Sequence, residues 1–261
     1  MTARVYAIAS GKGGTGKTTT TLNLGTSLAM LGKKTIIIDA DLGMANLGLL
    51  LGLEKSKITL HEVLSGEAEI KDAIYNMPSG LKVVPCGLSL KGFQKCNPDK
   101  LKQIIPDISD GMDYILIDVP AGISRDGVIP LAVADKVLLV VNPELSSLTD
   151  ALKTKTLTEL LGKQVEGVIV NRAELEKTEI NRNKVQELLG AQVIEMIPED
   201  ANVRRSAAFK IPVVIKTPAS PASIAFRRLA AKIAGEKFIE TNVTAKGSFL
   251  SRFTGKIFKS K

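Results

Sequence analysis

The feature that most restricts the fold is a glycine-rich run, SGKGGTGKTT, at positions 10–19. It follows a short apolar segment and precedes a segment with helical periodicity, and its spacing matches the pattern G-x-x-x-x-G-K-[ST]. Glycines allow backbone N–H groups to turn inward without a Cβ clash, and a following helix adds the positive end of its dipole. The run therefore predicts a strand, a phosphate-binding loop and a helix in succession.

The residues of this loop have distinct expected tasks. Lys17 places a positive charge on the outer phosphates, and the hydroxyl of Thr18 is a ligand for Mg²⁺. The other expected contacts to the nucleotide come from Gly11, Lys12, Gly13, Gly14, Thr15, Gly16 and Thr19. The sequence thus predicts that ATP binds with Mg²⁺. The alternative, a chance glycine-rich turn, leaves the strand before it and the helix after it unexplained.

Apolar runs alternate with longer amphipathic segments along the chain. The runs are continuously apolar, as in strands buried on both faces, so they predict an α/β fold with a doubly wound, mostly parallel sheet flanked by helices. The expected strands are 5–9, 35–38, 82–85, 114–118, 136–141, 165–170 and 192–196. The expected helices are 17–31, 98–105, 146–161, 180–189 and 220–234. Ligands of such sheets bind beyond the carboxyl ends of the strands.

Three aspartates follow predicted strands at that edge. Asp39 and Asp41 come directly after the strand 35–38, and Asp118 ends the strand 114–118. An apolar strand that ends in Asp is typical of a carboxylate that holds Mg²⁺, usually through water. Gly122 would allow the segment after Asp118 to respond to a γ-phosphate. A structural role, as a helix N-cap or a strand-end turn, remains open for each aspartate.

Three segments resemble the deviant Walker A family of P-loop ATPases, to which the MinD and ParA groups belong. KGGTGKTT at 12–19 resembles the motif K-G-G-x-G-K-T-T, while DADLGMANL at 39–47 and ILIDVPAGI at 115–123 resemble the two switch segments of the family. The resemblance extends over about residues 3–236. Within the family the MinD group is the most similar, because NPE at 142–144 and TDA at 149–151 match a segment of that group.

The resemblance implies roles for individual residues. Lys12 would reach across an ATP-bound homodimer to the phosphates of the partner, although a solvated surface lysine is the alternative. Asp41 would position the attacking water, so that Lys12, Lys17 and Asp41 form the catalytic set. Metal binding would fall to Thr18, Asp39 and Asp118.

Two further segments bear on which base is bound. The chain has no N-K-x-D run, which reads guanine in GTP-binding relatives of this fold. The predicted strand 165–170 ends in Asn171 and Arg172, and the strand 192–196 leads into Pro198 and Glu199. By resemblance to the MinD group, these four residues flank adenine. The run Pro198–Asp200 also suits the start of a helix, and both roles are compatible.

The charge of the chain is concentrated at its end. Of the net charge of +8, residues 243–261 contribute five Lys/Arg and no Asp/Glu, which leaves +3 for the rest. In GSFLSRFTGKIFKSK at 247–261, Phe249, Leu250, Phe253 and Ile257 fall on one helical stripe, with basic residues on another side. We therefore expect an ATPase domain at 1–237 and, at 238–261, a flexible tail with an amphipathic segment that binds an anionic membrane surface.

These features favour an ATP-hydrolysing positioning switch that dimerises with ATP and binds membrane, as in the MinD group. The alternative is a ParA-like partition ATPase that binds DNA, although a body near +3 makes nucleic acid a less suitable partner. Cys86 and Cys96 lack metal or redox spacing, and residues 1–10 do not resemble a signal peptide. We expect a cytoplasmic protein, peripheral on the inner face of the cell membrane, with an unidentified activating or cargo protein.

Overall fold

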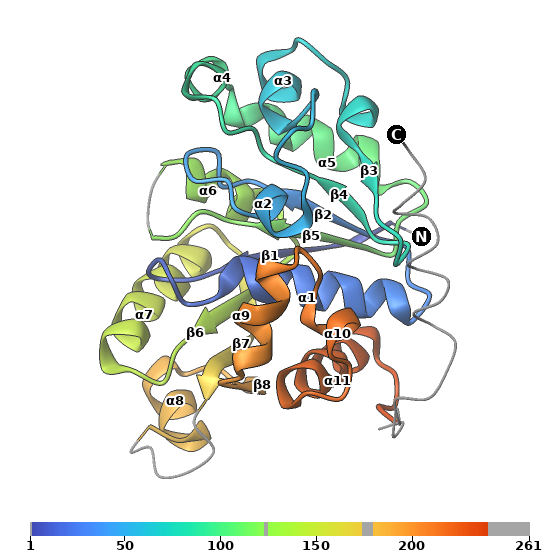
Figure 1. Ribbon diagram of the computed structural model, residues 1–261. Coiled ribbons are helices and arrows are strands. Elements are labelled where there is room, and N and C mark those ends of the chain that lie inside the picture. Colours follow the sequence, from blue (N-terminus) through green and yellow to red (C-terminus); the bar gives the residue numbers. More distant parts are fainter. Residues whose placement is uncertain (1, 123–124, 174–179, 240–261) are drawn as a thin grey trace, which may run out of the picture.

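The computed structural model describes residues 2–122, 125–173 and 180–239. Eight strands form one sheet in the order β3-β4-β2-β5-β1-β6-β7-β8, flanked by helices on both faces (Figure 1). All pairs are parallel except β3 with β4, which is antiparallel. The expected doubly wound, mostly parallel sheet is confirmed.

The strands are β1 Arg4–Ala9, β2 Thr35–Asp39, β3 Tyr75–Asn76, β4 Lys82–Val84, β5 Tyr114–Asp118, β6 Lys136–Val141, β7 Gln164–Ala173 and β8 Val193–Pro198. The longer helices are α1 Lys17–Met30, α5 Leu101–Ser109, α6 Arg125–Val133, α7 Leu145–Leu160, α8 Arg182–Leu189, α9 Ala201–Ala208 and α11 Pro221–Ala234. The shorter ones are α2 Leu47–Leu51, α3 Leu60–Ser65, α4 Leu90–Lys95 and α10 Val213–Lys216, with 3₁₀ turns at Ile70–Ala73 and Pro98–Lys100.

Two hydrophobic cores lie on the two faces of the sheet. Along β1, Val5 and Ala7 belong to one core, while Tyr6 and Ile8 belong to the other. This division explains why the strands read as continuous apolar runs, since both sides of each strand are buried. α1 and α11 pack against each other over one face, and α7 lies over β6 and β7.

The expected elements agree with the structure to within a few residues at their ends. The expected helix 98–105 is corrected, because it begins as a 3₁₀ turn and continues through Pro106 to Ser109 as α5. The strand β3 and the helices α2, α3, α4, α6 and α10 had not been expected from the sequence, whereas α9 follows the run Pro198–Asp200 that suited a helix start. Most of the unexpected elements span fewer than two helical turns, too few to show a clear periodicity. No described helix is long and apolar enough to cross a bilayer.

The order of the strands positions the site. β1 lies between β5 and β6, and β2 lies beside β5. The carboxyl end of β1 leads into the glycine-rich loop, while β2 and β5 end at Asp39 and Asp118, which are register partners. The expected loop and acids therefore meet at one edge of the sheet. The predicted tail falls outside the described residues from 240 onward.

Candidate functional site

The glycine-rich loop between β1 and α1 packs closely against α7 and the end of β7. A Cβ on Gly11 would lie 2.1 Å from the carbonyl carbon of Asp150 in α7. A Cβ on Gly16, whose φ is +87°, would lie 2.1 Å from Nδ2 of Asn171. That same Nδ2 donates a 2.7 Å hydrogen bond to the carbonyl of Thr15. The loop is thus held between α7 and the end of β7 at distances that leave no room for side chains.

Lys17 is the first residue of α1, and its ammonium is buried against the end of β5. Nζ lies 2.8 Å from Oδ1 of Asp118, and only 7% of the Lys17 side chain is exposed. Thr21, one turn further along α1, donates to the same oxygen at 3.2 Å. The other oxygen, Oδ2 of Asp118, is buried and has no hydrogen-bond partner among the described residues. Such an atom is costly to leave unsatisfied, and it is suited to accept a bond from a bound group.

Asp39 lies beside this ion pair at the end of β2 and is fully buried. Its carboxyl accepts the backbone N–H groups of Asp41 at 3.3 Å and of Leu47 at 3.1 Å, which folds the segment between them into a turn. Burial, together with the charge of Asp118, raises the pKa of Asp39 to about 8. Burial beside a second carboxylate thus disfavours the charged form of Asp39.

Asp41 is half-buried and lies closer to the surface of the site. Its Oδ1 accepts the N–H of Met44 at 3.1 Å. Burial raises the pKa of Asp41, and the charge of Lys17 opposes that shift. The turn role left open for both aspartates is therefore present, because both hold backbone N–H groups of one segment. It does not conflict with a role at the phosphates, since Asp41 has a second carboxylate oxygen.

Lys12 is anchored at the start of α7 rather than fully solvated. Its Nζ lies 2.8 Å from Oε2 of Glu144 and 3.0 Å from Oγ of Ser146. The Lys12 side chain is 31% exposed and that of Glu144 is 56% exposed, so water competes for this pair. An exposed pair of this kind contributes little to stability, and Lys12 is able to exchange Glu144 for another anion at small cost.

The residues expected beside adenine lie together at the ends of β7 and β8. Asn171 is buried and touches the loop, whereas Arg172 and Glu199 are exposed and form an ion pair with 3.7 Å between Nε and Oε2. Pro198 is the last residue of β8 and pairs with the end of β7. Asp200 accepts the N–H of Asn202 at 2.8 Å and caps α9, so the run also starts a helix, as the sequence allowed.

The donor set fits a nucleotide with Mg²⁺. Thr18, the second residue of α1, and Asp118 are oxygen donors of the kind that Mg²⁺ prefers. Among the described residues no cluster of three or more His, Cys, Asp or Glu could hold a metal unaided. Mg²⁺ bound together with a nucleotide usually takes its other ligands from phosphates and water.

Sequence reasoning missed two side chains of the site, Thr21 and Ser146, and one hydrogen bond. Thr21 was overlooked, although a threonine four residues after Lys17 lies one turn along the same helix. Ser146 as a partner of Lys12 had no local signal, because 134 positions separate the two residues. The hydrogen bond between Asn171 and Thr15 was equally hidden, since Asn171 was placed beside the base and not against the loop.

Comparisons with known proteins agree with this geometry. Residues 6–213 match the model of the CobQ/CobB/MinD/ParA nucleotide-binding domain. An ATP-binding protein of Methanocaldococcus jannaschii is 46% identical, over 99% of this chain and 98% of its own. The crystal structure of the Pyrococcus furiosus cell division ATPase MinD is 38% identical, with a TM-score of 0.86 over 89% of this chain and 99% of its own. MinD of Pyrococcus horikoshii, complexed with Mg-ADP, is 37% identical, with a TM-score of 0.85 over 88% of this chain and 96% of its own.

Proposed function

This chain belongs to the CobQ/CobB/MinD/ParA family of nucleotide-binding proteins, and we propose that it is a MinD-like switch that binds a membrane in its ATP state. It is an ATPase that uses ATP and Mg²⁺. The buried arrangement of Lys17, Asp118 and Asp39 beside the glycine-rich loop supports the nucleotide-dependent part of the proposal. The amphipathic, basic pattern at 247–261 supports the membrane part.

Different residues of this site would bind the phosphates, bind the metal and orient the attacking water. Backbone N–H groups of the loop and the ammonium of Lys17 would hold the phosphates. Thr18 and Asp118 would hold Mg²⁺, directly or through water, with support from Asp39. When bound, the metal neutralises charge that develops on the phosphates. Asp41, with a free carboxylate oxygen near the surface of the site, would orient the attacking water.

Dimerisation is the second step of the proposed switch. Lys12 is partly exposed and is held by an exposed ion pair with Glu144 and a hydrogen bond to Ser146. In a face-to-face homodimer, its ammonium would leave Glu144 for the phosphates bound by the partner. ATP would thus favour the dimer, and hydrolysis would release it.

Membrane binding is the third step, and it depends on the tail at 238–261. Burying one large apolar side chain contributes roughly 1.5–3 kcal/mol, whereas ordering each tail residue costs about 1–2 kcal/mol. A single tail would therefore bind weakly. Two tails in one dimer gain from effective concentration, which raises avidity by about 10²–10⁴. The protein would then be cytoplasmic and peripheral on the inner face of the membrane, where it positions the division site or another cargo through a protein partner.

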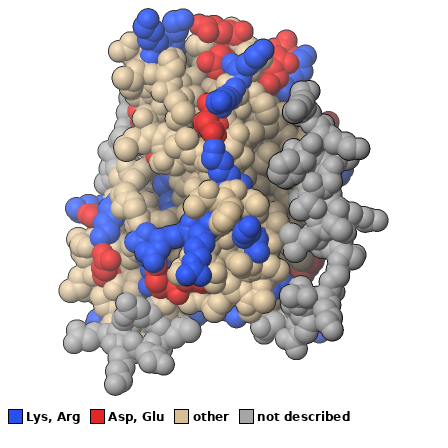
Figure 2. Space-filling model, viewed as in Figure 1, with Lys and Arg blue, Asp and Glu red and all other residues tan. Residues whose placement is uncertain are grey.

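The ParA-like alternative has one observation in its favour. A group of Lys and Arg side chains gathers on the face shown in Figure 2, over α9. Arg204 and Arg205 of that helix are exposed. Such a group could contact DNA phosphates, so the experiment that tests the proposal must also measure binding to DNA.

Sedimentation with liposomes and with plasmid DNA separates the two functions. We expect the full-length protein to sediment with anionic liposomes when ATP and Mg²⁺ are present, and much less with ADP. Phe253→Glu should abolish this binding, because it places a charge in the apolar stripe. Binding to liposomes without nucleotide, or equal binding by Phe253→Glu, would overturn the membrane switch. ATP-dependent binding to plasmid in place of liposomes would establish the alternative.

A further inference from the structure

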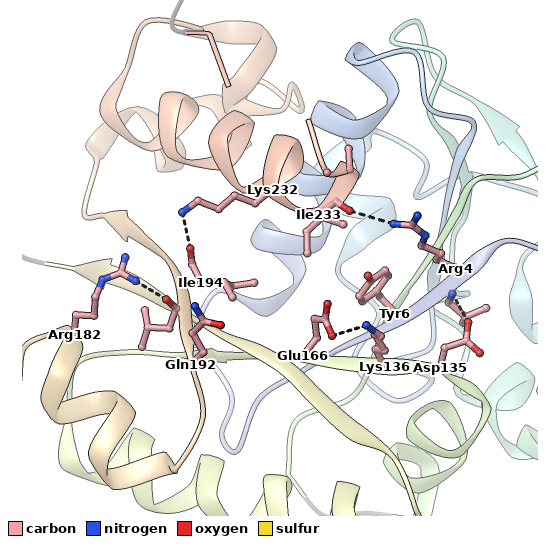
Figure 3. A pocket seen from close by; sticks show the side chains of 14 residues that line it. Arg4, Tyr6, Asp135, Lys136, Glu166, Arg182, Gln192, Ile194, Lys232 and Ile233 are labelled. Atoms are coloured by element: carbon pink, nitrogen blue, oxygen red, sulfur yellow. Dashed lines mark hydrogen bonds and ion pairs between the residues drawn. The ribbon is translucent and has the colours of Figure 1, made fainter. Parts of the chain in front are cut away.

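A trough of about 690 Å³ lies at the end of the sheet opposite the phosphate loop (Figure 3). The first residues of β1, β6 and β8 form its floor, together with Glu166 of β7. The last turn of α11 and Gly235 form one wall. Nothing in the proposed nucleotide chemistry uses this end of the molecule.

The charges that line the trough are unbalanced. Four of the lining residues are basic and two are acidic, namely Arg4, Lys136, Arg182 and Lys232 against Asp135 and Glu166. Both acids are already engaged. Asp135 accepts the N–H of Val5 at 2.9 Å, and Glu166 lies 2.6 Å from the ammonium of Lys136. Lys232 also has an acidic partner, Glu195, at 3.0 Å.

Arg4 and Arg182 are the two basic lining residues that have no acidic partner among the described residues. Nη1 of Arg4 makes only long contacts, 3.4 Å to the hydroxyl of Tyr114 and 3.5 Å to the carbonyl of Ile233. Arg182 donates to the carbonyl of Val193. Within the described part of the chain, neither arginine forms an ion pair with a carboxylate. They stand at opposite ends of the trough (Figure 3).

The surface between the arginines is mixed. Tyr6, Ile194 and Ile233 contribute apolar surface there, beside Gln192 and the Lys136–Glu166 ion pair (Figure 3). A guanidinium group offers five N–H donors in a planar fork that matches phosphate oxygens, and these two have donors to spare. The matching chemistry is a phosphate group on an amphipathic molecule, which offers both polar and apolar surface to this mixed lining.

We propose that this trough binds the phosphate headgroup of an anionic phospholipid. The choice of lipid over a soluble phosphate rests on the proposed membrane function and on position. Gly235 lines the trough, and the predicted membrane-binding stripe begins at Phe249, only 14 positions later. A single weak membrane anchor gives marginal binding, and stable attachment takes a second signal close to the first. The trough supplies that second signal on each protomer.

The test uses full-length protein carrying Phe253→Glu, so that the tail does not contribute, and monomeric dihexanoyl phosphatidylglycerol as the probe. We expect calorimetric titration to show binding that falls at least tenfold in the double variant Arg4→Gln with Arg182→Gln. The matched control, Arg204→Gln with Arg205→Gln, removes the same charge from α9 and should leave binding unchanged. Thermal unfolding and ATP hydrolysis of both double variants should match the parent, since all four side chains lie outside the nucleotide site.

Two further probes decide between the sources of the phosphate. Dihexanoyl phosphatidylcholine and inorganic phosphate should each bind at least tenfold more weakly than the phosphatidylglycerol probe. Equal binding of inorganic phosphate would make this a soluble-anion site and overturn the proposal, as would undiminished binding after loss of both arginines, or no binding at all. Failure of the membrane switch can be told apart from failure of this proposal. In that case the wild-type protein would not sediment with liposomes, although the short-chain lipid would still bind.

Discussion

The glycines of the phosphate loop differ in how well each position could accommodate a methyl group. Gly13, Gly14 and Gly16 stand in one loop but face different surroundings. A Cβ on Gly13 would meet nothing within 4 Å, and Gly13 does not have a positive φ. Gly14 has open space but a φ of +77°, while Gly16 combines a φ of +87° with the contact to Asn171. The three positions thus separate backbone strain from steric contact.

Alanine substitutions at these positions should rank in that order. Without nucleotide, Gly13→Ala should leave the free energy of unfolding nearly unchanged. Gly14→Ala should lower it by roughly 1–2 kcal/mol, the cost of a left-handed conformation for alanine. Gly16→Ala should lower it further, because Asn171 must also move. Urea denaturation of the three variants measures this series, and equal stability of Gly14→Ala and Gly16→Ala would contradict the close contact.

Lys17 is the residue on which phosphate binding should depend most. Lys17→Ala should weaken ATP binding by an order of magnitude or more, because a hydrogen bond to a charged group contributes about 1.5–3 kcal/mol. Lys95→Ala serves as the control, since Lys95 is an exposed lysine that pairs with Glu67 away from the phosphate loop. Fluorescent-nucleotide titration of both variants measures the difference. Unchanged affinity in Lys17→Ala would refute the assignment of the loop.

Asp41 should affect the rate of hydrolysis more than binding. Its carboxylate is half-buried beside the ion pair, and the turn of its segment is also held by Asp39. Asp41→Ala should therefore bind ATP almost normally and release phosphate much more slowly. Steady-state phosphate release checks this, and Asp41→Asn serves as an isosteric comparison. A wild-type rate in both variants would exclude a role in positioning water.

Among the elements, α11 depends on one buried acid in the adjacent strand. Glu195 in β8 is 2% exposed, and its carboxylate accepts from Arg228 at 2.8 and 2.9 Å and from Lys232 at 3.0 Å. Burial alone would raise the pKa of Glu195, but the hydrogen bonds from Arg228 and Lys232 outweigh burial and hold the pKa below its ordinary value. This contact attaches the last helix of the domain to the edge of the sheet.

The stability that Glu195 contributes should depend on pH in one direction. Its folded-state pKa lies below the unfolded value of 4.5, so the contribution is fully present above about pH 5 and is lost as the pH falls through the folded pKa. Glu195→Gln should lower the free energy of unfolding by about 1–3 kcal/mol at pH 7. Denaturation at pH 7, 5 and 3 should show the difference from wild type shrinking toward acid. A constant difference would mean that charge plays no part in this contact.

At the scale of the whole molecule, the nucleotide site and the trough proposed to bind lipid lie at opposite ends of the sheet. The loop follows the carboxyl end of β1, whereas α11 ends beside the amino ends of β1 and β8. Nothing in the described fold requires ATP to alter the distant end directly. In the proposed switch, a change in the number of tails per particle would couple the two ends without any such alteration.

Lys12→Ala tests this form of coupling. The variant should bind ATP normally, remain monomeric with ATP, and fail to sediment with anionic liposomes, because avidity requires two tails. Light scattering with ATP and liposome sedimentation measure the two properties in parallel. Forced dimerisation of the same variant, by fusion to a dimeric coiled coil, should restore membrane binding without restoring hydrolysis. A monomeric variant that still binds liposomes in response to ATP would show that the coupling acts through the protomer itself.

The sequence alone determined the features that local chemistry encodes. The spacing of Gly11, Gly16 and Lys17 specified the phosphate loop, because few other residues permit that backbone course. Continuous apolar runs identified strands buried on both sides, and the aspartates that follow two of them predicted the carboxylates of the site. Short elements such as α3 escaped prediction, since fewer than two turns of helix show little periodicity.

Only the tertiary structure decided which distant segments meet. The order of the strands places β5 and β6 on either side of β1, and this brings Asp118 to Lys17 across 101 positions of sequence. The contact of Asn171 with Thr15 and the exchangeable partner of Lys12 likewise follow from packing. The trough at the other end of the sheet forms because β1, β6, β8 and α11 converge there. Such contacts depend on how both faces of the sheet are covered, which is a property of the whole chain that no local pattern specifies.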